Sequence, residues 1–132
     1  MKRIVLATLF ASATALAGPY DQPYSQISTD RRPSADPLVI PVIVNRVDDV
    51  TVYNHKAVVP PGPHKVTVDV HGRKGFPPTQ VTFDLETKVC TRYYVSAKLK
   101  SPTLQEWTPF VRSEEPLLDC AKKFHIAATG AQ

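Results

Sequence analysis

The sequence contains four histidines, and imidazole is a common metal ligand. They are His55, His64, His71 and His125. His64 and His71 are seven residues apart, and an odd separation along one strand places two side chains on opposite faces. His55 falls at an expected turn, from which it could approach either of them. The spacing still favours polar surface residues, so we predict no metal site and no cofactor.

The sequence contains the residue types of a hydrolytic site, but they do not occur in the motifs that usually accompany such a site. Serine, histidine and aspartate all occur, yet there is no G-x-S-x-G segment to expose a nucleophilic serine and no glycine-rich phosphate loop. The acidic pairs Asp48-Asp49 and Glu114-Glu115 are adjacent, and neighbours on a strand point to opposite faces. We predict no catalytic residue and no enzymatic activity. A small hydrolytic or metal-dependent enzyme, assembled from distant segments, stays open as an alternative.

The two cysteines are Cys90 and Cys120. They lack the C-x-x-C spacing of a metal site or a redox pair. In an oxidising compartment two such cysteines form a disulfide. We therefore predict a Cys90–Cys120 bridge.

The first 17 residues predict export from the cytoplasm. They combine a basic start at Lys2-Arg3, a short apolar stretch and the small-residue ending Ala15-Leu16-Ala17, which are the parts of a cleaved signal peptide. The apolar stretch is shorter than the roughly 20 residues of a membrane-spanning helix. We expect a periplasmic or secreted protein without a membrane span after cleavage.

Charge and composition exclude further classes. Of the 132 residues, 42% are hydrophobic and 21% are charged, as in globular proteins. The formal net charge of +4 falls to +2 when Lys2 and Arg3 leave with the signal peptide. The remaining basic residues are scattered among acidic ones, so no nucleic-acid-binding face is expected.

The mature chain divides into three parts. Residues 18–37 contain four prolines and few aliphatic residues, and we predict an extended arm. Residues 38–124 alternate between apolar and polar positions over several short segments, which predicts an all-β fold, an antiparallel Ig-like or transthyretin-like β-sandwich. Residues 125–132 are expected to be a frayed tail.

The expected strands share alternating or β-branched sequences. They are residues 38–44, a hairpin of 50–53 and 56–59 around Asn54-His55, residues 64–71, 80–86, 91–100 and an interrupted strand at 106–112, with a short helix or strand at 116–124. Pro41 lies inside the first run, which is apolar on both faces. We expect that run at a sheet margin, covered by another part of the chain or by a partner.

The middle of the chain resembles a known family. Val59-Pro60-Pro61-Gly62-Pro63-His64 leads into Val66-Thr67-Val68, and Gly75-Phe76 precedes a further alternating strand. This pattern is similar to the PEGA-type modules, small transthyretin-like β-sandwiches of bacterial surface and exported proteins. The resemblance implies a transthyretin-like fold. The wider chain is similar to small exported proteobacterial proteins, which implies a compartment and no activity.

Three groups of residues are candidates for recognition. Tyr94 and Trp107 are aromatic side chains of the type that anchors interfaces, Val39 and Ile43 lie on the marginal strand, and Arg73, Lys74 and Phe76 form a cationic loop within residues 72–78. A tryptophan such as Trp107 more commonly lies in the core, and a loop such as 72–78 is more commonly an ordinary hairpin connection.

We predict a non-enzymatic binding or structural accessory protein of the periplasm or cell envelope, whose partner is another envelope or secreted protein. A secreted inhibitor of a hydrolase, which presents a rigid loop, is an alternative.

The signal peptide gives the first testable prediction. The native protein should have the intact mass of a chain that starts at Gly18, because the A-x-A site ends at Ala17. Intact-mass analysis of protein recovered from its natural source measures this. A full-length product retained in the membrane would refute the predicted cleavage.

Overall fold

The computed structural model describes residues 18–70, 79–103 and 106–127. The predicted signal peptide, the loop with Arg73, Lys74 and Phe76, and the end of the predicted tail lie outside these ranges. Within them the elements are β1 (Ser25–Thr29), β2 (Val39–Pro41), β3 (Ile43–Val47), β4 (Val50–Thr51), β5 (Lys56–Val59), β6 (Gly62–Val70), β7 (Thr79–Thr87), β8 (Thr91–Leu99), β9 (Trp107–Pro116) and α1 (Leu118–Lys123). No helix in these ranges is long and apolar enough to cross a membrane.

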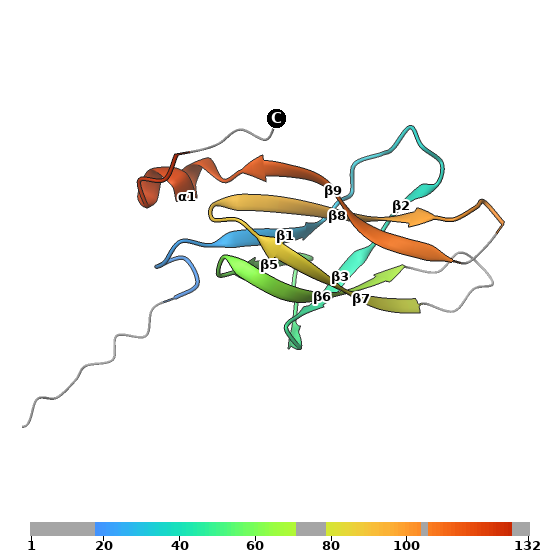
Figure 1. Ribbon diagram of the computed structural model, residues 1–132, viewed down its shortest axis with the longest axis horizontal. Helices are drawn as coiled ribbons and strands as arrows, with labels where there is room; N and C mark the ends of the chain where they lie inside the picture. Colours follow the sequence, from blue (N-terminus) through green and yellow to red (C-terminus); the bar gives the residue numbers. More distant parts are fainter. Residues whose placement is uncertain (1–17, 71–78, 104–105, 128–132) are drawn as a thin grey trace, which may run out of the picture.

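The strands form two sheets (Figure 1). In the first sheet, β8 pairs with β9 on one edge and with both β1 and β2 on the other, and β5 pairs with β1. The second sheet has the order β4-β3-β6-β7. All these pairings are antiparallel except that of β1 with β8. The protein is therefore mostly β, as predicted, with two largely antiparallel sheets.

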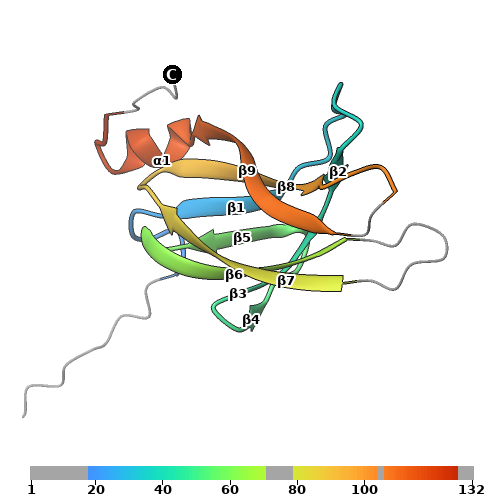
Figure 2. The same cartoon turned by 45° about the vertical axis from the view of Figure 1, so that its right-hand side comes forward.

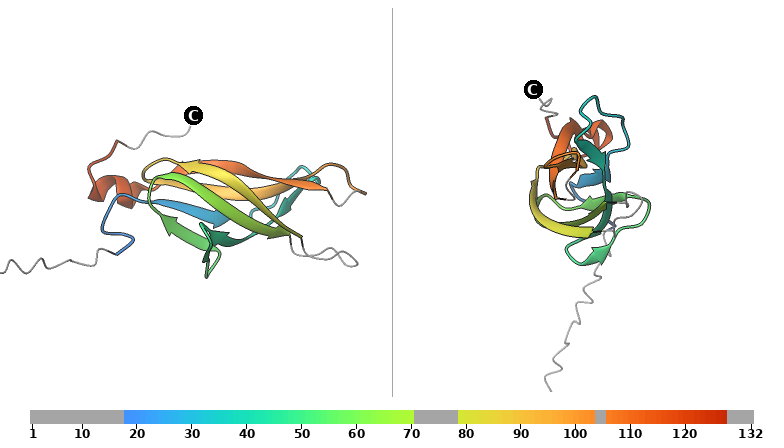
Figure 3. Two further views of the ribbon diagram at one scale, coloured as in Figure 1. Left: turned by 60° about the horizontal axis from the view of Figure 1, so that its bottom comes forward. Right: turned by 90° about the vertical axis from the view of Figure 1, so that its right-hand side faces the viewer.

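One hydrophobic core lies between the two layers, which Figure 3 shows end-on in its right-hand view. Ile27 and Val95 come from the first sheet, Val44, Val66 and Val68 come from the second, and all five are at most 1% exposed. The alternation predicted for 64–71 and 91–100 is confirmed on this inner face for residues 64–70 and 91–99, and His71 lies outside the described residues. β-branched residues that alternate with polar ones suit such a half-buried sheet.

A second, smaller core lies under α1, at one end of the first sheet (Figure 1). The predicted Cys90–Cys120 disulfide is present there, and it joins the turn between β7 and β8 to the helix. Tyr24 and Leu117 pack against it. Closing a loop of this length stabilises a fold by about 3.5 kcal/mol in the chain-entropy model.

The structure differs from the predicted arm at residues 18–37. Ser25–Thr29 is β1, which lies between β8 and β5 with Ile27 fully buried. Its other buried residues, Ser25, Gln26 and Ser28, are polar, so the segment lacks the apolar alternation of the later strands. Backbone pairing on both edges holds it in the sheet. The folded unit thus begins before residue 38.

The apolar run of residues 38–44 is split between the two sheets. β2 is a short marginal strand that pairs with β8, and β3 belongs to the second sheet. The crossing occurs at Val42, which is buried in the core. The run is apolar on both faces because its two halves face the core from different layers.

The predicted hairpin around Asn54-His55 is wrong, although the turn itself exists. Asn54 and His55 have φ of 61° and 57°, but the chain that follows them, β5, pairs with β1 instead of β4. The hairpin lies earlier, where β3 pairs with β4 across Asp48-Asp49, with φ of 51° and 64°. Two positive φ values are typical of the type I′ turn of a two-residue hairpin.

The position of β1 gives the second prediction. A chain that starts at Pro33 lacks β1 and should not fold, because β5 and β8 lose their shared neighbour and Ile27 leaves the core. A chain that starts at Gln22 keeps β1 and is the control. It should fold with slightly reduced stability, since it loses the edge-to-face contact of Tyr20 with Tyr24. Circular dichroism and thermal melting measure both; a cooperative melt of the shorter chain would show that β1 is dispensable.

Candidate functional site

An open groove of about 750 Å³ lies at one end of the molecule. Its apolar lining comes from Leu38, Val81, Leu99 and Trp107. Trp107 begins β9 opposite Leu99 of β8, so both side chains are on the core face of the first sheet. Trp107 is partly buried against the core and also lines the groove. Trp107 is thus partly a core residue, and its role in recognition stays a prediction.

Charged side chains form the rim of this groove. Lys98 Nζ is 3.4 Å from Asp36 Oδ2, and Lys100 Nζ is 3.3 Å from Glu106 Oε2. All four side chains are substantially exposed, and exposed ion pairs of this kind contribute little to stability. A ligand carboxylate could replace either acidic partner at small cost.

Tyr94, predicted on the solvent face of β8, lies there under arginine side chains. The guanidinium of Arg32 is 4.4 Å from the centre of its ring, and that of Arg92 is 6.0 Å away. The Tyr94 hydroxyl donates to Glu115 Oε1 at 2.8 Å, and Arg92 donates to the same oxygen at 2.7 Å. The hydrogen bond from Tyr94, helped by Arg92, holds the pKa of Glu115 below its usual range. Tyr94 is thus held in a network of side chains on the outer face of β8, and its role as an interface anchor stays a prediction.

Asp30 is the centre of this network, and its side chain is 0% exposed. Its carboxylate accepts hydrogen bonds from Arg32 Nε at 2.9 Å and from Arg112 Nη1 at 3.2 Å. Arg112 lies at an irregularity in the pairing of β8 with β9, and it also donates to the carbonyls of Arg32 and Pro33. Burial alone would raise the pKa of Asp30, but the hydrogen bonds and charge of Arg32, with that of Arg112, outweigh burial and lower it.

The sequence pattern did not reveal this cluster. Ser96 lies on the outer face of β8, yet it is 1% exposed because the chain after β1 passes over it. The only local signal was an acidic residue two positions before an arginine, Asp30 and Arg32. That spacing does not predict the long-range partner Arg112.

A second polar contact missed by the sequence reasoning joins His64 to the β3–β4 turn. Nδ1 of the buried His64 faces Asp48 Oδ2, and Nε2 is 2.6 Å from the carbonyl oxygen of Pro60. Both ring nitrogens therefore face oxygen acceptors. The hydrogen bond from His64, followed by that from the Lys65 N–H, lowers the pKa of Asp48. Since both nitrogens are occupied, His64 is not arranged as a general base.

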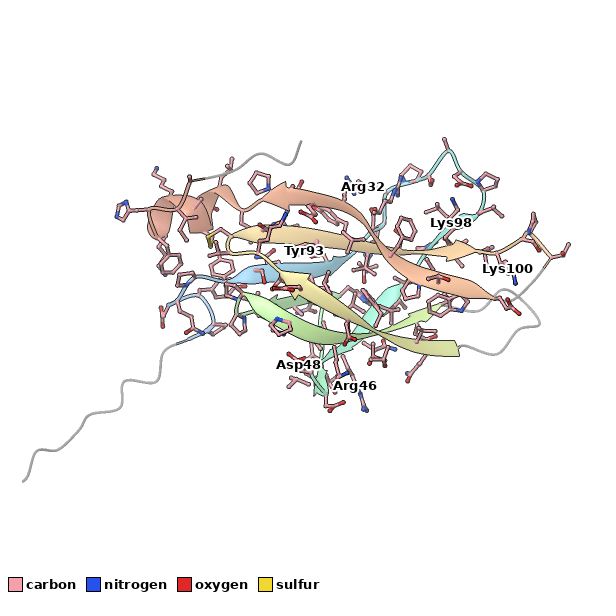
Figure 4. The ribbon with its side chains drawn as sticks, viewed as in Figure 1. Arg32, Arg46, Asp48, Tyr93, Lys98 and Lys100 are labelled. Carbon is pink, nitrogen blue, oxygen red and sulfur yellow. A yellow bond between two sulfur atoms is a disulfide. The ribbon has the colours of Figure 1, made fainter. Side chains whose placement is uncertain are left out.

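The other predicted residues are not brought together at one site. Val39, in β2, lines a small cavity of about 150 Å³ beside Asp30 and Arg112, whereas Ile43 lies in β3 opposite Asp69. Trp107 and Tyr94 belong to separate surfaces. In Figure 4, Lys98 and Lys100, which line the groove, lie at the right, Arg32 lies at the top, and Asp48 lies at the bottom. Within the described ranges, no three metal-ligating side chains gather around a common point.

Comparisons with known proteins give no relative from which a function could be transferred. No family model matches the chain, and neither the curated proteins nor the solved structures contain a match.

The Asp30 network gives the third prediction. Asp30→Asn keeps the shape of the side chain and removes the charge between two guanidinium groups, so it should lower the free energy of unfolding by about 2 kcal/mol at neutral pH. Because the pKa of Asp30 is lowered in the folded state, its contribution is present above about pH 4 and is lost as the pH falls further. The melting-temperature difference between wild type and variant should therefore narrow from pH 7 to pH 2.

The matched control is Asp84→Asn, which changes an exposed carboxylate paired with Lys65. Its melting temperature should stay close to that of the wild type throughout. A difference for Asp30→Asn that does not change with pH would contradict a charged Asp30 in the folded protein.

Proposed function

We propose that this protein is an exported, non-enzymatic accessory protein of the periplasm or cell envelope, which binds another envelope or secreted protein at the Trp107 groove. The proposal rests on one observation, an open groove with an aromatic and aliphatic lining and a rim of exposed lysines. Its volume falls within the range of ligand sites, and tryptophan is favoured at the centre of interfaces. The predicted signal peptide and the disulfide support export.

The occupant that fits the groove is an extended segment of a partner protein. Leu38, Val81, Leu99 and Trp107 would contact an apolar side chain of that segment. A flanking carboxylate of the segment would reach Lys98 or Lys100 in place of Asp36 or Glu106. The groove would therefore favour a partner segment in which an apolar residue lies next to an acidic one.

The alternative of a hydrolytic enzyme has less support. A general base needs a free nitrogen or carboxylate beside a nucleophile, but His64 is occupied on both sides and Asp30 lies between two arginines. These polar groups stabilise the fold.

We also propose that the fold is of the transthyretin-like or Ig-like kind, as the resemblance to PEGA-type modules implies. The two-layer arrangement around one core supports this. The disulfide differs from an immunoglobulin pattern, because it joins the turn between β7 and β8 to α1 instead of joining the two sheets.

The fourth prediction tests the groove. The double variant Lys98→Glu/Lys100→Glu reverses the charge of the rim without touching the core, so it should fold normally. Recovery of a specific partner with the affinity-tagged protein from the native envelope should fall about tenfold or more, because the partner's carboxylate is then repelled.

The control Lys65→Glu/Lys88→Glu makes the same charge change at two other exposed lysines that are each paired with a carboxylate. Recovery of the partner should remain at the wild-type level. The groove would be refuted as the binding site if the two double variants recovered the same amount of the partner, whether at the wild-type level or below it.

A further inference from the structure

A projecting segment that follows β3 carries two apolar side chains into solvent. Val50 is 68% exposed and Tyr53 is 77% exposed, the two highest values among the large hydrophobic residues that the structure describes. Figure 2 shows β4, which contains Val50, at the bottom of the molecule, away from α1. Figure 4 places Asp48 at the same side and Lys98 and Lys100, which mark the groove, elsewhere. We refer to residues 48–55 as the projecting loop.

The backbone of the projecting loop is fixed at both ends. Asp48-Asp49 and Asn54-His55 each form a left-handed pair, and Asn and Asp adopt this conformation more readily than most residues. The Val52 N–H donates to the Asn45 carbonyl at 2.8 Å, and the Thr29 N–H donates to the His55 carbonyl at 3.1 Å. Val52 packs against the main core, while its neighbour Tyr53 points to solvent.

Side-chain contacts brace the same loop against β6. Asp48 Oδ1 accepts the Lys65 N–H at 2.8 Å, Asp48 Oδ2 faces Nδ1 of His64, and the Asp48 N–H donates to the Lys65 carbonyl at 2.8 Å. One residue of the turn is thus held by three contacts to a central strand. A loop held in this way loses little conformational entropy when it binds a partner.

We propose that the projecting loop is an insertion loop, which places Val50 and Tyr53 in a concave apolar pocket of a second protein. A convex and braced loop needs a concave receptor, and tyrosine is among the residues that contribute most to protein interfaces. The segment 46–56 has two basic and two acidic residues, so it lacks the surplus of Lys and Arg that attracts an anionic membrane. A cation at the mouth of the pocket would face the exposed Asp49. This surface is independent of the Trp107 groove.

Photo-cross-linking in the producing cells tests the insertion loop. The photoreactive residue p-benzoyl-phenylalanine is introduced in place of Tyr53 and, in a control protein, in place of Leu118. Leu118 is 66% exposed on α1, so it matches the exposure of the projecting loop without belonging to it. We expect a discrete adduct with another protein from position 53 that position 118 does not give, and the cross-linked peptide should come from a concave apolar pocket of that protein.

Competition with unlabelled protein shows whether the adduct is specific. Wild-type protein should compete for it, and Tyr53→Ser should compete at least tenfold more weakly, although its melting temperature stays within a few degrees of the wild type because the side chain is exposed. Equal competition by Tyr53→Ser would overturn the proposal. So would equal labelling from position 118, an adduct with lipid, an adduct with a second copy of this chain, or no adduct.

A second variant tests the brace. Asp48→Asn keeps a residue that accepts a positive φ but removes the charge that faces His64. We expect it to compete several-fold more weakly than wild type while Val50 and Tyr53 remain in place. Competition equal to that of the wild type would overturn the claim that the loop is held ready for binding.

Discussion

The pairing of β1 with β8 is the constraint on which the rest of the structure depends. The two strands run parallel, and parallel neighbours cannot be joined by a hairpin. The chain between them must leave the sheet and return, and it uses this connection to build the whole second sheet, β4-β3-β6-β7. Between β4 and β6 the chain returns once to the first sheet, where β5 pairs with the free edge of β1. The core between the layers follows from this single pairing, because its second layer is the crossover itself.

The same pairing explains the buried charge. β1 and β2 share one edge of β8, with Thr29 opposite Val95 and Pro41 opposite Ser96. The chain between them cannot stay in the sheet and passes over its outer face, where Asp30 becomes fully buried. A buried carboxylate is strongly unfavourable unless it is paired, and the irregularity at Arg112 supplies the second guanidinium. The network with Arg32 and Tyr94 is thus a structural consequence of the topology.

Sequence patterns predicted those elements whose structure is decided by residues close together in the chain. The alternation of apolar and polar residues predicted the inner faces of β6 and β8, and the presence of two cysteines predicted the disulfide. β1 was not predicted, because Ser25–Thr29 contains one aliphatic residue and is held by backbone hydrogen bonds to strands that are distant in the sequence. The hairpin was misplaced because Asp48-Asp49 and Asn54-His55 adopt the same left-handed conformation, and only the pairing of the flanking strands distinguishes them. The contacts of Arg112 with Asp30 and of His64 with Asp48 join different elements, so their spacing in sequence carries no signal.

The distribution of polar partners decides which surfaces can recognise another molecule. The carboxylates of Asp30, Asp48 and Glu115 are held by arginine, histidine or tyrosine, and a ligand that engaged them would first have to break these contacts. The exposed ring of Tyr53 on the loop and the apolar side chains that line the groove offer apolar area whose removal from water is favourable. The two surfaces lie on different sides of the molecule, so occupation of one leaves the other accessible. If the groove and the projecting loop each bind the partner proposed for it, one molecule would hold two proteins side by side and so raise the effective concentration of each for the other.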